Sequence, residues 1–547
     1  MRSEAPAAQS RDVLLKRFET LNEIGVALSS ERDLKRLLEL ILEAARKFAN
    51  ADGGTLYRVH DNHLVFEVLR NDTLGFCMGG KTGKHIDFAP LPLYDKEGNG
   101  NHTMVVAHAA LTGETVNIPD AYSAVGFDFS GTRAFDAKTG YRSKSFLTIP
   151  MKNSAGEVIG VLQLINSRSD DGSTVDAFSE AEQQLVESLA SQAAIALSNR
   201  LLSEQQENLF ESLISLINSA IDEKSPYTGG HCERVPMLTM MLAEAVDRSA
   251  IGPLSDFKMT DADRYELKIA GLLHDCGKIT TPVHVVDKAT KLQTLFDRIE
   301  LIDTRFEVLQ RDLEIARLKG EINDEEHARQ SAAILVDREA VRVSNVGAEF
   351  MPDAQLAVIQ NLAKRTWQPV GESPRPFLSA DELENLSIRK GTLTRAEREI
   401  INHHIAMTIK MLEALPWPKH LLRVPEYAGG HHERMDGKGY PRGLKREEMS
   451  VQARVMGIAD IFEALTAGDR PYKLGKPLSE SIRILGLMMQ DNHIDADLFE
   501  IFLRERVYMR YAKRFLPPQQ IDRIDWAKIP GLSAPLREFL TEADSGR

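Results

Sequence analysis

The chain has 547 residues, more than one hydrophobic core normally serves, so we expect two or three domains. Its composition, 43% hydrophobic and 27% charged, is ordinary for a globular protein, and three cysteines (Cys77, Cys232 and Cys276) are too few for a disulfide framework. The net charge of −13 argues against broad binding to nucleic acid or to an anionic membrane surface.

No targeting or membrane-spanning segment is predicted. No apolar run reaches the roughly 20 residues that span a bilayer. Residues 1–12 lack the apolar core of a signal peptide. Because cysteines are few, a reducing compartment is the simplest interpretation. We therefore expect a cytoplasmic protein that binds neither a membrane nor a nucleic acid polymer.

The first part of the chain changes from a helical to a strand-like pattern. Residues 13–50 are predicted to form an amphipathic helix, because their apolar residues follow helical spacing. Residues 53–165 alternate short apolar stretches with Gly, Pro, Asn and Asp turns, which is typical of an antiparallel sheet. The clearest strands are expected at 54–59, 63–69, 145–150 and 158–165, with a hairpin turn at 153–156.

A long helix is predicted from Ser179 to about Asp222, a stretch without Pro or Gly. Ser179 and Glu182 have the spacing of a capping box. The apolar residues step by threes and fours, so the helix can connect two domains and pair with a second copy of the chain. Packing of its first half on its own domain is an equally good interpretation.

Most of residues 223–525 has helical periodicity. An unbroken stripe with alternating spacings of three and four runs from Leu292 to Ala316 and stops before Gly320. A second helical pattern continues to about Val341. We expect an antiparallel helical hairpin over 290–341, followed by a proline-rich loop at 367–376.

Histidines and aspartates scattered through this helical region form the strongest candidate site. His274 and Asp275 end a predicted apolar helix, and Asp460 lies inside another, where an unpaired carboxylate would be costly. A lone histidine at a helix end is usually structural, so the interpretation depends on how many such residues there are. The predicted metal ligands are His231, His274, Asp275, His404, His431, His432 and Asp460.

Seven ligands are too many for one ion, whereas two ions that share a bridging carboxylate would use them. We expect Asp275 to bridge. Imidazole and carboxylate ligands without thiolate favour Fe or Mn over structural zinc. Two divalent transition metal ions about 3.5–4 Å apart suit phosphoester cleavage. Lys278, one helical turn beyond His274, is placed to reach the scissile phosphate, so a metal-dependent phosphohydrolase is predicted.

Four motifs resemble those of the HD-GYP phosphodiesterases, in the same order. They are YTGGHCERV around His231, HDCGK at 274–278, HHERMDGKGYP at 431–441, and ADIFEALT at 459–466 with RPYK at 470–473. The resemblance covers about 223–285 and 391–510. It implies an all-helical fold and hydrolysis of cyclic di-GMP, or a related 3′,3′-cyclic dinucleotide, to a linear dinucleotide or a mononucleotide.

The same resemblance implies roles for individual residues. It makes Asp275 and Lys278 catalytic, and it implies substrate contacts from Gly439, Tyr440, Pro441, Arg470 and Lys473. Arg470 and Lys473 are basic, as phosphate clamps need to be.

This sequence departs from the HD-GYP pattern in several places. Asp275 and His404 are separated by an insertion over roughly 290–390, where the family has a short connection. His403 competes with His404 for the ligand position, and the spacing favours His404. Glu463 replaces a more common Asp. The insertion leaves open which dinucleotide the groove admits.

Residues 20–200 resemble a GAF domain, a sensory α/β fold with a central antiparallel sheet. The residues that carry the resemblance are 139–145, 149–153 and 156–166. A subgroup found in cyclic-nucleotide phosphodiesterases and cyclases has a downstream five-residue signature, of which this chain keeps Asn166 and Phe178 but has Ser167, Glu182 and Gln183. A small-molecule ligand is expected, and its identity is left open.

The predicted architecture is therefore multidomain. A GAF sensory domain (α/β, of the α+β type) at 13–200 is followed by a connecting helix at 180–222. An HD-GYP domain at 223–525 then carries the insertion at about 290–390, before a C-terminal tail at 526–547. The leading hypothesis is a homodimeric cyclic dinucleotide phosphodiesterase regulated by its GAF domain. A non-catalytic cyclic dinucleotide receptor that signals through the hairpin, and an HD-type phosphohydrolase of another nucleotide, remain as alternatives.

Overall fold

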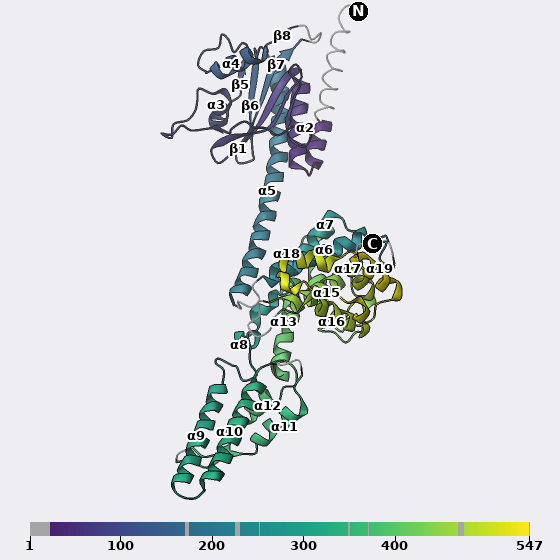
Figure 1. Ribbon diagram of the computed structural model, residues 1–547. Coiled ribbons are helices and arrows are strands. Elements are labelled where there is room, and N and C mark those ends of the chain that lie inside the picture. Colours follow the sequence, from purple (N-terminus) through teal and green to yellow (C-terminus); the bar gives the residue numbers. More distant parts are fainter. Residues whose placement is uncertain are drawn as a thin grey trace, which may run out of the picture. The chain divides into compact units, whose positions relative to one another are not determined.

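A computed structural model describes residues 22–169, 174–224, 230–250, 252–347, 350–369, 371–468 and 475–545. The chain divides into two compact units, one up to Phe210 and one from Glu211 onward. The first is an α/β unit and the second is almost entirely helical (Figure 1). Among the residues described, no helix is both long and apolar enough to cross a membrane.

The first unit is built on an antiparallel sheet with the strand order β3-β2-β1-β7-β6-β5. The predicted strands are confirmed, and each neighbouring pair is antiparallel. The turn between β6 and β7 is closed by Asn153, whose side-chain oxygen accepts hydrogen bonds from the N–H groups of Ala155 and Glu157. The strands are β1 (Ala51–His60), β2 (His63–Asn71), β3 (Phe76–Gly79), β4 (Leu91–Pro92), β5 (Val116–Ile118), β6 (Phe146–Lys152), β7 (Val158–Arg168) and β8 (Val175–Asp176).

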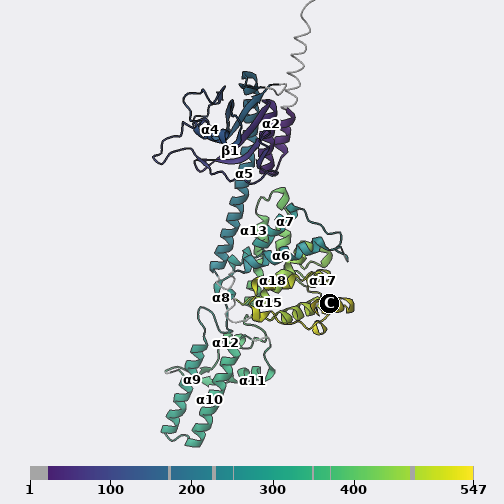
Figure 2. The same cartoon turned by 45° about the horizontal axis from the view of Figure 1, so that its top comes forward.

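Helices cover both faces of this sheet (Figures 1 and 2). On one face, α2 (Leu34–Phe48) and the start of α5 (Glu180–Lys224) pack on Leu162 and Leu164 of β7. On the other face, α3 (Val105–Thr112) packs on Val161 of the same strand, and α4 (Ser130–Thr139) follows it. Alternate residues of β7 therefore serve two different cores, as the pleat of a strand dictates.

The single helix predicted over residues 13–50 is wrong. Residues 22–30 are helical, residues 31–33 are not, and α2 then begins. Asp33 makes the break, because its carboxylate caps the new helix by accepting the N–H of Arg36. Residues 13–21 lie outside the described part of the chain.

The long helix α5 has two different halves. At its start, Ser179 and Glu182 form the predicted capping box. Val186, Leu189 and Ala193 in the first half are buried in the sheet's core. Further along, Leu202, Leu209 and Leu216 are all more than half exposed.

The second unit is a helical assembly in which α15 packs on α6, and α13 packs on η1. Residues 526–545, expected as a tail, form η5 and α19, which bury Trp526, Leu536 and Leu540. The helices outside the insertion are α6 (His231–Arg248), α7 (Asp261–Leu273), η1 (Cys276–Thr280), α8 (Val283–Val286), α13 (Arg395–Glu413), η2 (Lys419–Leu421), α14 (Val424–Gly429), η3 (Arg446–Glu448), α15 (Val451–Thr466), α16 (Leu478–Gln490), α17 (Ala496–Arg504), α18 (Val507–Phe515), η4 (Pro518–Gln520), η5 (Trp526–Lys528) and α19 (Ala534–Ser545).

The inserted segment has a hydrophobic core of its own. Ile302 and Phe306 from α9 pack with Val341 from α10 and with Phe377. The turn between these two helices contains Gly320, whose φ of 71° suits glycine. The elements are α9 (Ile299–Leu318), α10 (Asp324–Asn345), α11 (Asp353–Leu362), α12 (Ala380–Leu386) and the short strands β9 (Thr366–Trp367) and β10 (Arg375–Pro376).

Candidate metal centre

The seven predicted ligands come from five separate helical segments of the second unit. His231 opens α6, His274 ends α7, and Asp275 directly precedes η1. His404 lies within α13, His431 and His432 follow α14, and Asp460 lies within α15. The packing of α13 on η1 and of α15 on α6 brings these segments together.

Four of the histidines are held by hydrogen bonds at Nδ1. The Nδ1 atoms of His274, His404 and His431 lie 2.7, 2.5 and 2.6 Å from the backbone oxygens of Gly271, Ile401 and Ala428, three residues earlier in each case. A carbonyl only accepts, so each Nδ1 carries the proton and each Nε2 presents a lone pair. The Nδ1 of His231 lies 2.6 Å from a carboxylate oxygen of Glu463.

The side chains gather into two groups. His231, His274 and Asp275 form one, and His404, His431 and His432 form the other; within each group the ligand atoms lie within 4.8 Å of one another. Asp275 lies between them. Its Oδ2 is 3.0 Å from Nε2 of His231 and 3.2 Å from Nε2 of His274, while its Oδ1 is 3.2 Å from Nε2 of His404. One carboxylate thus faces both groups, as a bridging ligand does.

Asp460 completes the first group from the side of α15. Its Oδ1 lies 3.4 Å from Nε2 of His231 and 4.0 Å from Nε2 of His274. Burial opposes ionisation of both aspartates, but neighbouring positive groups outweigh it. Lys278 holds the pKa of Asp275 well below its usual range, and the protonated ring of His231 lowers the pKa of Asp460. Both carboxylates are therefore anionic at neutral pH.

Two histidines of the second group, His431 and His432, are neutral because burial disfavours their charged form. Burial lowers the pKa of His432 to about 4 and that of His431 well below its usual value. In the first group, burial again disfavours the charged ring, but hydrogen bonds to Asp275 and Glu463 raise the pKa of His231 to about 9. A cation bound there would displace that proton.

Two buried atoms at the centre have no hydrogen-bond partner, namely Nε2 of His431 and Oδ1 of Asp275. Buried polar atoms without partners are costly. Several lone pairs and two anionic carboxylates point into the same small space. A divalent cation in each group would bind these lone pairs and neutralise the carboxylates. The donor set of imidazole and carboxylate without thiolate fits transition metal ions such as Fe or Mn.

Sequence reasoning missed the role of Glu463. Its buried carboxylate accepts from His231 at 2.6 Å and from Nε of Arg234 at 2.8 Å. It thereby fixes the orientation of His231, a predicted metal ligand. The signal available was its position on α15, three residues after Asp460 and hence on the same helix face.

Lys278 and the glycine-rich loop flank the two groups. Nζ of Lys278 lies 2.5 Å from Oδ2 of Asp275. The ring of Tyr440 stacks on that of His432, with centroids 4.9 Å apart. A side chain at Gly439 would come within 2.5 Å of the backbone of Arg434 and Glu433, so only glycine fits there.

Glu433 fixes the shape of this loop. Its buried carboxylate accepts hydrogen bonds from the backbone N–H groups of Arg442, Gly443 and Leu444. Pro441 is exposed next to Tyr440. Of the predicted substrate contacts, Arg470 and Lys473 lie outside the described residues.

The packing of η1 on α13 explains two further positions. Gly277 donates its N–H to the hydroxyl of Thr408 at 2.9 Å, and a Cβ on Gly277 would lie 2.0 Å from the carbonyl oxygen of His404. His403 is exposed, whereas His404 is buried in the second group. The geometry therefore selects His404 from the adjacent pair.

Comparisons with known proteins agree with this division. The model of the GAF domain matches residues 33–197, and two HD domain models match residues 228–347 and 379–498. The chain carries a GAF domain followed by an HD domain. The predicted resemblance of the second unit to HD-GYP phosphodiesterases is confirmed by the curated proteins that the chain matches.

Three curated relatives illustrate the similarity. A 3′3′-cGAMP-specific phosphodiesterase 3 from Vibrio cholerae is 25% identical over 275 residues, covering 50% of this chain and 35% of the relative. A 3′3′-cGAMP-specific phosphodiesterase 1 from the same species is 41% identical over 81 residues, which are 15% of this chain and 19% of the relative. A cyclic di-GMP phosphodiesterase from Thermotoga maritima is 39% identical over 101 residues, which are 18% of this chain and 27% of the relative. The chain thus spans about a third or less of the length of these relatives.

Proposed function

We propose that this chain is a metal-dependent phosphodiesterase that hydrolyses cyclic di-GMP, or a related 3′,3′-cyclic dinucleotide, to a linear dinucleotide or a mononucleotide. The observation that carries the proposal is the geometry around Asp275. Its two oxygens face two separate sets of imidazole Nε2 atoms, whose Nδ1 atoms are anchored elsewhere. Such an arrangement is suited to two ions bridged by one carboxylate.

The predicted ligands would hold two ions, and Lys278 would contact the substrate. His231, His274, Asp275 and Asp460 would hold one ion, and His404, His431 and His432, with Asp275, the other. When bound, the two ions would activate water and neutralise the phosphodiester. The ammonium of Lys278, placed by its contact with Asp275, would meet a phosphate oxygen and add positive charge at the reacting centre.

Tyr440 supports a planar substrate close to the ligands. Its ring already stacks on His432, so a guanine base that approaches the predicted ligands would meet an aromatic pair. Because the side chain of Tyr440 is only partly exposed and the loop is tied to Glu433, this wall needs little ordering upon binding. Gly439 and Pro441 flank Tyr440 in the same loop. Arg470 and Lys473 are proposed as further substrate contacts from the motif resemblance alone.

Regulation and assembly are parts of the same proposal. The GAF domain would act as the sensor, through α5. The exposed Leu202, Leu209 and Leu216 of α5 recur at heptad spacing, so pairing of this helix in a homodimer would bury them. A ligand-dependent change in that pairing would then alter the HD-GYP domain.

Turnover of the metal-loaded chain tests the proposal. The chain is loaded with Mn²⁺ under low oxygen, and cyclic di-GMP and 3′3′-cGAMP are assayed by chromatography. We expect hydrolysis of at least one of them, its loss in the double variant His274→Ala with Asp275→Ala, and its retention in His403→Ala. Tight binding without turnover would instead support a receptor. Turnover that survives the double variant would show that the site is elsewhere.

A further inference from the structure

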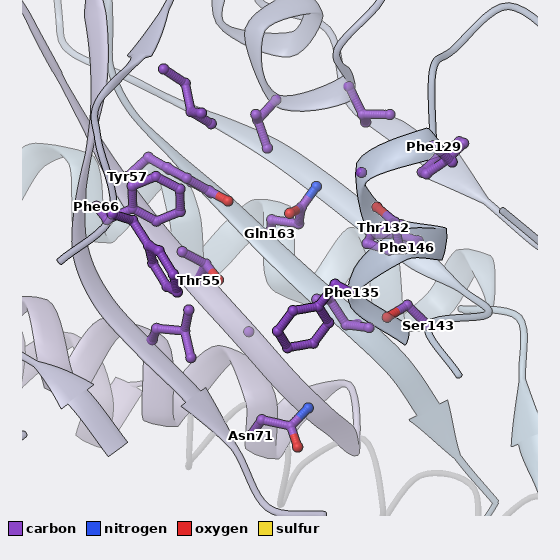
Figure 3. Close-up of a pocket in the computed structure, with 18 of the residues that line it drawn as sticks. Thr55, Tyr57, Phe66, Asn71, Phe129, Thr132, Phe135, Ser143, Phe146 and Gln163 are labelled. Carbon is purple, nitrogen blue, oxygen red and sulfur yellow. The ribbon is translucent and has the colours of Figure 1, made fainter. Parts of the chain in front are cut away.

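The first unit contains a large cavity between its sheet and the segment that carries α3 and α4 (Figure 3). Its volume is about 550 Å³, which is within the range of small-molecule sites. Eight of its lining residues are aromatic. The rings come from Tyr57, Phe66, Phe76, Phe88, Phe129, Phe135, Tyr141 and Phe146.

A strip of three polar side chains crosses the sheet beneath this cavity; Thr55 and Gln163 line the cavity, and Thr148 lies beside Gln163 outside the lining. Thr55 on β1 pairs directly with Gln163 on β7, and Gln163 pairs directly with Thr148 on β6. Directly paired residues point to the same face of a sheet, so the three side chains are neighbours. Their exposed fractions are only 5%, 9% and 0%, respectively. Thr55 and Gln163 are therefore buried polar groups that lie among aromatic side chains.

The amide of Gln163 is only partly satisfied by the protein. Its Nε2 donates to the hydroxyl of Thr148 at 3.1 Å, which uses one of its two N–H groups. Figure 3 shows the amide near the centre of the cavity, between Tyr57 and Phe135. A buried amide is stabilised when both its N–H and its oxygen are hydrogen-bonded. The edge of a heteroaromatic ring can do this, because it presents a donor and an acceptor side by side.

The charges of the cavity disfavour an anion. Arg70 is the one cation among the lining residues, all of which lie in the described part of the chain. Its guanidinium is already committed, because it donates to the carboxylate of Glu39 at 2.9 Å and to the carbonyl oxygens of Leu69 and Met78 at 2.9 and 2.6 Å. No lining side chain therefore has a positive charge to spare for a phosphate.

The start of α4 offers no anion site either. Ser130, Gly131 and Thr132 line the cavity there, where backbone N–H groups would otherwise attract a phosphate. However, the carboxylate of Asp128 accepts the N–H of Ser130 at 2.8 Å. This hydrogen bond lowers the pKa of Asp128, so the helix terminus already faces a negative charge. A second anion would be repelled.

We propose that this cavity binds an uncharged, planar heteroaromatic compound of nucleoside size, whose ring edge is hydrogen-bonded by Gln163 and Thr55. The aromatic walls supply stacking surface, and the polar strip selects a ring edge with an adjacent donor and acceptor. A cyclic nucleotide with the same base is disfavoured, because its phosphodiester brings a charge that the lining cannot neutralise. This inference is independent of the reaction proposed for the HD-GYP domain.

Matched ligand pairs test the inference on the full chain. Guanosine and adenosine are titrated calorimetrically beside cyclic GMP and cyclic AMP, with a chelator present so that metal-dependent binding does not contribute. We expect micromolar binding of at least one nucleoside and binding at least tenfold weaker for its cyclic nucleotide. A cyclic nucleotide that binds as tightly as its nucleoside would overturn the proposal. The absence of nucleoside binding up to millimolar concentration would also overturn it.

Variants then locate the binding. Gln163→Leu is expected to weaken nucleoside binding about tenfold, since it leaves a ring edge unpaired. Thr55→Val keeps the shape of the side chain and removes only its hydroxyl, so it is the second test variant if Gln163→Leu does not fold. Gln184→Leu makes the same replacement at an exposed position of α5 and should change nothing. Nucleoside binding unaffected by both Gln163→Leu and Thr55→Val would place the site outside this cavity.

Discussion

Removing the charge of Glu463 tests how the first group of metal ligands is held. The buried carboxylate of Glu463 accepts hydrogen bonds from His231 at 2.6 Å and from Arg234 at 2.8 Å. In Glu463→Gln the shape is kept, but the amide cannot hold the imidazole and the guanidinium as strongly. Loss of such an orienting partner typically costs about 10–100-fold in metal affinity or activity. We expect this loss in metal affinity, with a similar fall in turnover.

The assay is a competition titration with a chelating dye, with turnover measured at saturating metal. Glu463→Asp restores the carboxylate on a shorter side chain, so it should recover part of the affinity. Glu447→Gln removes the same charge from an exposed position and serves as the matched control. Breaking a buried ion pair also destabilises the fold by about 3–5 kcal/mol, so melting of the metal-free protein is recorded in parallel. Unchanged metal affinity in a folded Glu463→Gln variant would refute the reasoning.

Three further predictions follow from local geometry. Gly277→Ala would place a Cβ 2.0 Å from the carbonyl oxygen of His404, so we expect a loss of roughly 1–3 kcal/mol or more in chemical denaturation. Lys291 is 1% exposed, and burial lowers its pKa from 10.5 to about 8. Because the unfolded chain binds that proton more tightly than the folded chain, the charged side chain destabilises the fold below pH 8. This destabilisation decreases between pH 8 and pH 10.5, as the folded side chain loses its proton. Lys291→Met should therefore stabilise the insertion at pH 7 by up to roughly 3 kcal/mol and by little at pH 10.5, as followed by Trp367 fluorescence, whereas Lys319→Met at an exposed position should not. Leu209→Glu should weaken or abolish the homodimer in sedimentation, and a dimer of unchanged strength would exclude α5 as its interface.

Patterning in the sequence predicted the sheet of the GAF domain well, because its strands alternate clearly between turns. The pattern failed at Asp33, because an aspartate can lie within a helix or cap the start of a new one, and the sequence does not distinguish these two positions. In the HD-GYP domain, the candidate ligand motifs stood out in the sequence because His and Asp residues are rare in apolar helices. Glu463 and Glu433 could not be assigned in the same way, since their roles arise only when distant segments meet.

Stepwise metal loading tests whether Asp275 bridges two ions. Metal-free protein is titrated with Mn²⁺ while bound metal and turnover of cyclic di-GMP and 3′3′-cGAMP are measured on the same samples. We predict two ions per chain and hydrolysis that rises only as the second ion binds. Full activity with one ion, or two bound ions without hydrolysis of either compound, would show that Asp275 does not bridge a catalytic pair of ions.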